Sequence, residues 1–160
     1  MANPQVALLL GLIDQAFDHK AWHGTNLRGS IRRVGVEDAA SRPGPGRHNI
    51  WEIVVHAAYW KYIVRRRVLS QAKGSFPLEG SNWFTRPSGK PTEAEWKRDV
   101  KLLLETHRSM RAAVTGFTDA DLRVKPEGSK VSNVALIMGI ASHDLYHAGQ
   151  IQVLKRLRKA

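Results

Sequence analysis

Apolar residues recur at helical spacing along most of the chain. Near the N-terminus they form one stripe, made of Leu8, Leu9, Leu12, Ile13, Ala16 and Phe17. Asn3-Pro4 precedes this stripe and is typical of an N-cap followed by proline in the first turn. This helix is predicted to end near His19 or Lys20. The same spacing predicts a short helix over residues 25–34 and long helices over residues 49–71, 92–114 and 132–157.

Proline and glycine mark the connections between these helices. Residues 41–46 read Ser-Arg-Pro-Gly-Pro-Gly, which is incompatible with a helix. Residues 73–91 hold three prolines and three glycines and form a linker long enough to run the length of a bundle. Thr92 and Glu95 then match a capping box at the start of the next helix.

The predicted architecture is all-α. Four substantial helices joined by one long crossover, with an extra short helix, indicate a four-helix bundle. A chain of 160 residues suits one domain, so residues 1–160 are expected to form a single unit.

Composition narrows the chemistry. The chain has no cysteine, which excludes a disulfide scaffold, a zinc site with cysteine ligands and a cysteine nucleophile. It carries 25 Lys and Arg against 14 Asp and Glu, a formal charge of +11 that favours anionic partners. The apolar run at residues 6–13 lacks the basic flank of a targeting signal. The uncharged run at residues 131–142 is too short to span a bilayer. A cytoplasmic protein without a membrane anchor is expected.

Two of the seven histidines lie four residues apart on the last predicted helix. His143 and His147 therefore stack on one helical face, where two imidazole nitrogens can bind one divalent cation. Such a pair also occurs as ordinary core histidines bonded to carbonyls. Here both interrupt an apolar stripe, so they need polar partners or a metal; the stripe comprises Leu136, Ile140, His143, His147, Gln150 and Leu154.

A third ligand must come from upstream. The H-E-x-x-H zinc protease motif takes its third ligand after the second histidine, but no His, Asp or Glu follows His147. His56 is the best candidate, because it lies on a mostly apolar face of the helix predicted over residues 49–71. Three protein ligands leave coordination positions open, which is typical of a catalytic site.

These motifs resemble a known family. Residues 22–27 read Trp-His-Gly-Thr-Asn-Leu, Arg42-Pro43 follows, and residues 48–56 read His-Asn-Ile-Trp-Glu-Ile-Val-Val-His. Residues 143–151, His-Asp-Leu-Tyr-His-Ala-Gly-Gln-Ile, match a C-terminal H-D-x-x-H-x-G-Q-I signature. Together they resemble the damage-inducible DinB/YfiT-like metalloproteins, which are unrelated to the DNA polymerase of the same name.

The resemblance implies a four-helix bundle with a divalent metal, Zn²⁺ or Ni²⁺, held by His56, His143 and His147. Characterised relatives include transferases and isomerases that use bacillithiol, mycothiol or glutathione, with the metal lowering the pKa of the thiol. Other members are regarded as metal-dependent hydrolases, and many have no assigned reaction. A homodimer is typical of the family. The expected function is thus a metal-dependent enzyme that activates a thiol cofactor or water to act on a small molecule.

Five further residues are candidates around this site. Glu52 is a candidate general base or acceptor for an imidazole N–H, and it could equally pair with Arg47 or another cation. Gln150 is placed either to orient a metal-bound water or a ligand carbonyl, or to hydrogen-bond the backbone in the core. Asp144 suits either an acceptor behind the ligands or a surface salt bridge. His23 and His48 recur in the family-like segments and are expected near the pocket mouth. Three tryptophans are expected in the core, namely Trp22, Trp51 and Trp60.

Two basic clusters support an alternative function. They comprise Lys61, Arg65, Arg66 and Arg67, and Lys155, Arg156, Arg158 and Lys159. Most such charges form a solvated face, but converging clusters would suit a non-catalytic module that binds nucleic acid or another polyanion. No helix-turn-helix or patterned basic-aromatic surface accompanies them, so nucleic acid is the weaker prediction.

Overall fold

The computed structural model describes residues 3–158 and contains helices but no strands over that range. The all-α prediction is therefore confirmed. The four long helices are α1 (Pro4–Phe17), α4 (Ile50–Val68), α5 (Glu93–Thr115) and α7 (Asn133–Leu157). Three short helices accompany them, where one was predicted: α2 (Leu27–Ile31), α3 (Val36–Ala40) and α6 (Asp119–Arg123). Among the described residues, no helix combines the length and apolar character needed to span a membrane.

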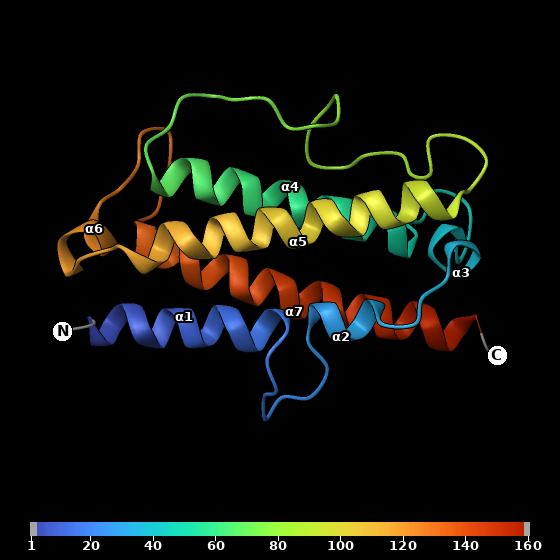
Figure 1. The fold of residues 1–160 in the computed structure, drawn as a ribbon, viewed down its shortest axis with the longest axis horizontal. Helices are drawn as coiled ribbons and strands as arrows, with labels where there is room; N and C mark the ends of the chain where they lie inside the picture. The colour runs from blue at the N-terminus through green and yellow to red at the C-terminus, as the bar shows by residue number, and fades with distance from the viewer. Residues whose placement is uncertain (1–2, 159–160) are drawn as a thin grey trace.

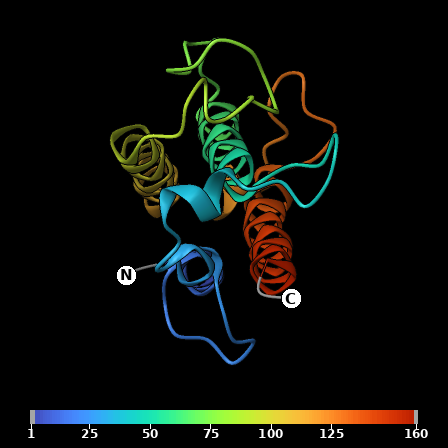
Figure 2. The same cartoon turned by 90° about the vertical axis from the view of Figure 1, so that its right-hand side faces the viewer.

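The long helices run side by side as a bundle (Figure 1). Helices α1 and α2 lie almost end to end along one edge, and both pack against α7. Helix α4 packs against both α5 and α7. The crossover over residues 69–92 runs outside the bundle along α4, which the end-on view also shows (Figure 2). Because the bundle covers one side of α4 and the crossover another, residues 50–58 are all buried.

Helix ends match the sequence signals in most places. The Asn3 side chain accepts a hydrogen bond from the backbone N–H of Gln5 at 2.9 Å, as an N-cap does. Thr92 likewise caps α5 through the N–H of Glu95. The reciprocal half of that capping box was wrong, because the Glu95 carboxylate binds Ser88 and Arg86 in the crossover instead.

The tryptophan predictions were partly wrong. Trp51 is fully buried and donates its indole N–H to Asp99 at 2.7 Å. Trp60 is only half-buried. Trp22 is fully exposed, because it lies in the loop between α1 and α2 and reaches no core.

A buried ion pair joins α4 to α7. Lys61 and Asp144 are 0% and 1% exposed, and their Nζ and Oδ2 atoms lie 2.5 Å apart. Burial lowers the pKa of Lys61, while burial raises the pKa of Asp144 to about 6 against the opposing effect of Lys61. Both parts of the sequence-based view need correction: Lys61 does not belong to a solvated basic face, and the Asp144 salt bridge is internal.

We expect the Lys61→Met substitution to lower the free energy of unfolding by about 3 kcal/mol, because it leaves the Asp144 carboxylate buried without a partner. The Lys61→Met/Asp144→Leu double variant should recover most of that loss, since no charge then remains at the site. Urea unfolding of the metal-free protein measures both effects. Equal destabilisation of the single and double variants would contradict this account.

Candidate metal centre

Three histidines from two helices meet at one point. His56 comes from α4, and His143 and His147 come from successive turns of α7. The Nε2 atom of His143 lies 3.1 Å from that of His56 and 3.0 Å from that of His147. One ligand atom from each residue falls within 4.8 Å of the others, so the predicted triad is brought together.

The second nitrogen of two of these rings is already engaged. Nδ1 of His56 lies 2.8 Å from the backbone carbonyl of Asn82, which only accepts hydrogen bonds. His56 therefore carries its proton on Nδ1 and directs the lone pair of Nε2 toward the other two rings. Nδ1 of His147 lies 2.7 Å from Oε1 of Gln150, so His147 also carries its proton on Nδ1 and keeps the lone pair on Nε2. Metal-ligating histidines are commonly held in this way.

The surroundings keep the three imidazoles neutral. Burial lowers the pKa of His56 below its ordinary value, more than the Asn82 carbonyl raises it. Burial, together with the neighbouring His147 and His56, lowers the pKa of His143 to about 3. Burial lowers the pKa of His147 to about 4. At neutral pH all three rings thus have lone pairs available for a cation.

The donor set fits a divalent metal. Tetrahedral imidazole–zinc bonds of about 2.0–2.1 Å place two ligand nitrogens about 3.3–3.4 Å apart, and the two separations given above are a few tenths of an ångström shorter. Without an ion, the His143 Nε2–H could donate to only one of the two lone pairs that face it. A shared cation satisfies all three nitrogens at once.

Comparison with known proteins agrees with this site. The chain matches the family model of the DinB superfamily over residues 20–151, a range that contains all three histidines. The chain belongs to the DinB superfamily. No curated protein and no solved structure matches it.

In this DinB-superfamily chain the crossover completes the surroundings of His56. The Trp83 ring stacks on the His56 imidazole with a centroid separation of 3.8 Å, and His48 stacks on the opposite face of Trp83 at 3.6 Å. Asn82, whose carbonyl binds His56, has a positive φ of 62°. Its side-chain oxygen accepts a hydrogen bond from the Trp60 indole at 2.9 Å.

Asn82 and Trp83 were not among the site residues predicted from the sequence, and Lys61 was assigned to a basic cluster. An aromatic pair, Trp83-Phe84, within a Gly- and Pro-rich linker was the signal that the linker docks onto the bundle. Lys61 lies at helical spacing from Ile53, Ala57 and Val64, on an apolar face of the helix. This spacing was the signal for a buried ion pair, because a charge on an apolar face needs a buried partner.

Glu52 lies near the crossover but has other partners. Its carboxylate binds the Arg42 guanidinium through both oxygens and lies 2.9 Å from Nδ1 of His48. The backbone N–H of Arg86 also donates to it at 3.3 Å. Burial raises the pKa of Glu52, but the hydrogen bonds from Arg42 and His48 outweigh it and lower the pKa overall. The structure thus places Glu52 in an ion-pair network, and its role as a base stays a prediction.

The remaining candidates fall at different distances from the triad. Gln150 contacts His147 directly, one turn along α7. Asp144 is turned toward Lys61 inside the bundle. His48 reaches the triad only through Trp83. His23 is exposed in the loop between α1 and α2, where it lines a separate hollow of about 380 Å³ with Leu145 and Gly149.

We expect purified protein to carry about one divalent ion per chain. The His143→Ala and His147→Ala variants should lose it, because each removes one of three converging nitrogens. Elemental analysis after dialysis measures the metal content. His19→Ala serves as the matched control, since His19 is exposed and binds Asp18 instead. A fully loaded His143→Ala/His147→Ala double variant would show that the metal lies elsewhere.

Proposed function

We propose that this DinB-superfamily protein is a metal-dependent enzyme that transfers or hydrolyses a group on a small molecule. His56, His143 and His147 would hold Zn²⁺ or Ni²⁺, and the activated group would be a thiol cofactor or water. The observation that carries the proposal is that three neutral imidazoles converge through their Nε2 atoms. In His56 and His147 the Nδ1 atom is engaged by a hydrogen bond. A bound divalent ion supplies a Lewis acid that lowers the pKa of a thiol or water.

The chain's own residues fix the orientation of the ligands. The Asn82 carbonyl and the Gln150 side chain hold the Nδ1 protons of His56 and His147, so that Nε2 of each ring points inward. The stacked Trp83 ring covers one face of His56 and shields it from water. Because all three imidazoles are neutral, they would leave the charge of a bound ion uncompensated, which would favour an anionic cofactor or substrate group.

Aromatic side chains surround the triad on several sides. Trp60 lies edge-on to His56 and His143, and Tyr146 lies edge-on to His147. Tyr146 is 64% exposed, and Trp60 and Trp83 are half-buried. These partly accessible rings favour a substrate with an apolar or planar group next to the reacting atom.

The role of Gln150 is testable through metal affinity. Gln150→Leu removes the acceptor of the His147 Nδ1 proton and should weaken metal binding about 10–100-fold, as is typical when the partner of a metal-bound histidine is lost. Gln150→Glu retains an acceptor and should bind metal tightly. The control is Gln152→Leu, two residues along, whose side chain bonds to Thr25. Competition with a chromophoric chelator measures the affinities, and equal affinities for Gln150→Leu and Gln152→Leu would contradict this role.

The proposed chemistry is testable by cobalt substitution. Titrating the Co²⁺ protein with glutathione, bacillithiol or mycothiol should produce a thiolate-to-cobalt charge-transfer band if a thiol is the activated group. A visible cobalt spectrum that changes with pH but not with thiols would instead support water. His143→Ala should abolish either response. A cobalt spectrum that responds to neither pH nor thiols would overturn the proposal.

The homodimer implied by the family resemblance stays a prediction. Exposed apolar side chains on α1 and α7 support it, since these two helices pack together. Leu8 is 77% exposed, and Val153 on α7 is 56% exposed.

A further inference from the structure

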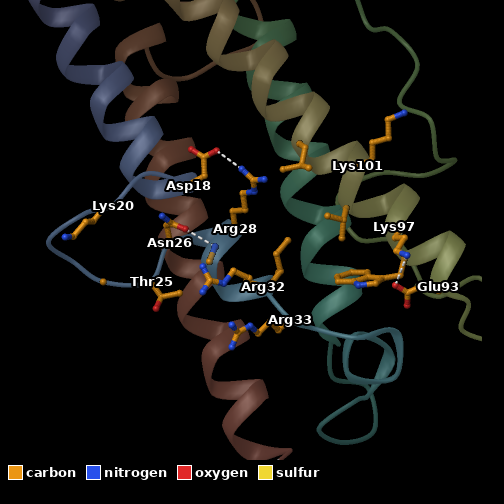
Figure 3. A pocket seen from close by; sticks show the side chains of 16 residues that line it. Asp18, Lys20, Thr25, Asn26, Arg28, Arg32, Arg33, Glu93, Lys97 and Lys101 are labelled. Atoms are coloured by element: carbon orange, nitrogen blue, oxygen red, sulfur yellow. Dashed lines mark hydrogen bonds and ion pairs between the residues drawn. The ribbon is translucent and has the colours of Figure 1, made fainter.

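A second candidate site lies in a groove between α2 and α5. It has a volume of about 1110 Å³ and is bounded by the loop before α2, by α2 and the turn after it, and by the first half of α5 (Figure 3). None of its lining residues is one of the three histidines, or one of the residues that contact them. This groove is therefore separate from the proposed metal centre.

The rim of the groove is strongly basic. Six cationic side chains line it against two carboxylates; the cations are Lys20, Arg28, Arg32, Arg33, Lys97 and Lys101. Arg28 pairs with Asp18 at 3.3 Å and Lys97 pairs with Glu93 at 3.4 Å, as the dashed lines in Figure 3 mark. Within residues 3–158, no carboxylate pairs with Arg32 or Arg33, which lie side by side on the exposed turn after α2. These two guanidiniums are available to an external anion.

Arg33 occupies a backbone position that is unfavourable for arginine. Its φ is 62°, in the left-handed region where a helix commonly ends in glycine or asparagine. An arginine there costs stability relative to glycine. The same turn places Arg33 and Arg32 at the edge of a neighbouring hollow of about 710 Å³ as well. The strained backbone thus presents a free guanidinium between two hollows.

The floor of the groove is apolar. Trp96 and Ile31 are 5% and 7% exposed, and Val100 and Leu104 of α5 extend the same surface. The Trp96 indole N–H donates to the carbonyl of Val34 at 3.1 Å, so it offers no donor to a ligand. Figure 3 shows Arg28, Arg32 and Arg33 on the α2 side of the groove, across from Lys97 and Lys101 of α5. The groove therefore has an anion-binding rim and an apolar wall.

We propose that this groove binds a small organic anion, in which a phosphate or carboxylate contacts Arg32 and Arg33 and an apolar body lies against Trp96 and Val100. Guanidinium groups bind both kinds of anion through paired hydrogen bonds. An oligonucleotide is the alternative that the tests below separate, because its binding would depend steeply on salt.

The ligand class is testable by isothermal titration calorimetry with four probes. These are 1-naphthyl phosphate, 1-naphthoate, inorganic phosphate and 1-naphthol. At least one of the two naphthyl anions should bind, and comparing them distinguishes a phosphate ligand from a carboxylate ligand. Inorganic phosphate and 1-naphthol should each bind about tenfold more weakly or worse, because each lacks one half of the interaction.

Variants identify the site. Arg33→Gly removes the guanidinium and suits the positive φ, so affinity should fall about tenfold while the thermal midpoint stays equal or rises. Arg32→Gln should weaken binding similarly. Lys125→Gln, an exposed charge in the loop before α7, should leave affinity unchanged. His143→Ala should also leave it unchanged, which separates this groove from the metal centre.

Four outcomes would overturn the proposal. The first is that neither naphthyl anion binds. The second is that Arg33→Gly binds as tightly as the native chain. The third is that Lys125→Gln weakens binding as much as Arg33→Gly does, because binding then reflects net charge alone. The fourth is that a single-stranded oligonucleotide binds the groove more tightly than the naphthyl anions, with a steep salt dependence.

Discussion

The ion pair between Lys61 and Asp144 fixes the relation between the two helices that carry the three clustered histidines. Both side chains are buried, and each charge is tolerated inside the bundle only when the other lies beside it. Sliding or rotating α7 against α4 would separate them. Because His143 is adjacent to Asp144 in the chain and His56 lies five residues before Lys61, the same register brings their Nε2 atoms to 3.1 Å. The ion pair therefore ties the geometry of the site to the stability of the fold.

The carboxylates nearest the triad are committed to cations of the protein. Asp144 binds Lys61, and Glu52 binds Arg42 and His48. The imidazoles are consequently left as neutral nitrogen donors in a buried, carboxylate-poor setting. A cation held there would keep most of its charge. The acid of the H-D-x-x-H segment thus joins α7 to α4 through Lys61.

The sequence predicted the long helices and the pair of His143 and His147 for the same physical reason, whereas His56 was added from an apolar helical face and from the family resemblance. Helical spacing is local, so a pattern of apolar residues identifies α1 or α7, and two histidines four residues apart must share a face. The rotation of α7 was less well predicted, since its inward face centres on Asp144 and Ala148 and leaves His143 only half-buried. Tertiary packing sets that rotation, and the helical spacing that places Lys61 on an apolar face does not identify its partner 83 positions away. The prediction that Trp22 lies in the core was wrong for the same reason, because the neighbours of Trp22 depend on how its loop packs.

The crossover shows why a linker can belong to a site. Its end is anchored by Arg86, which binds Asp99 and Glu95 of α5 and whose carbonyl accepts a hydrogen bond from Asn49 at 2.7 Å. Asn82 and Trp83 lie within four residues of that anchor, so their contacts with His56 require little additional ordering of the chain. The crossover also packs against the bundle, with Phe84 buried in the same apolar cluster as Trp51 and Val54. Substitutions at Asn82 or Trp83 would therefore alter the contacts of His56, while the buried pair of Lys61 and Asp144 would still join α4 to α7.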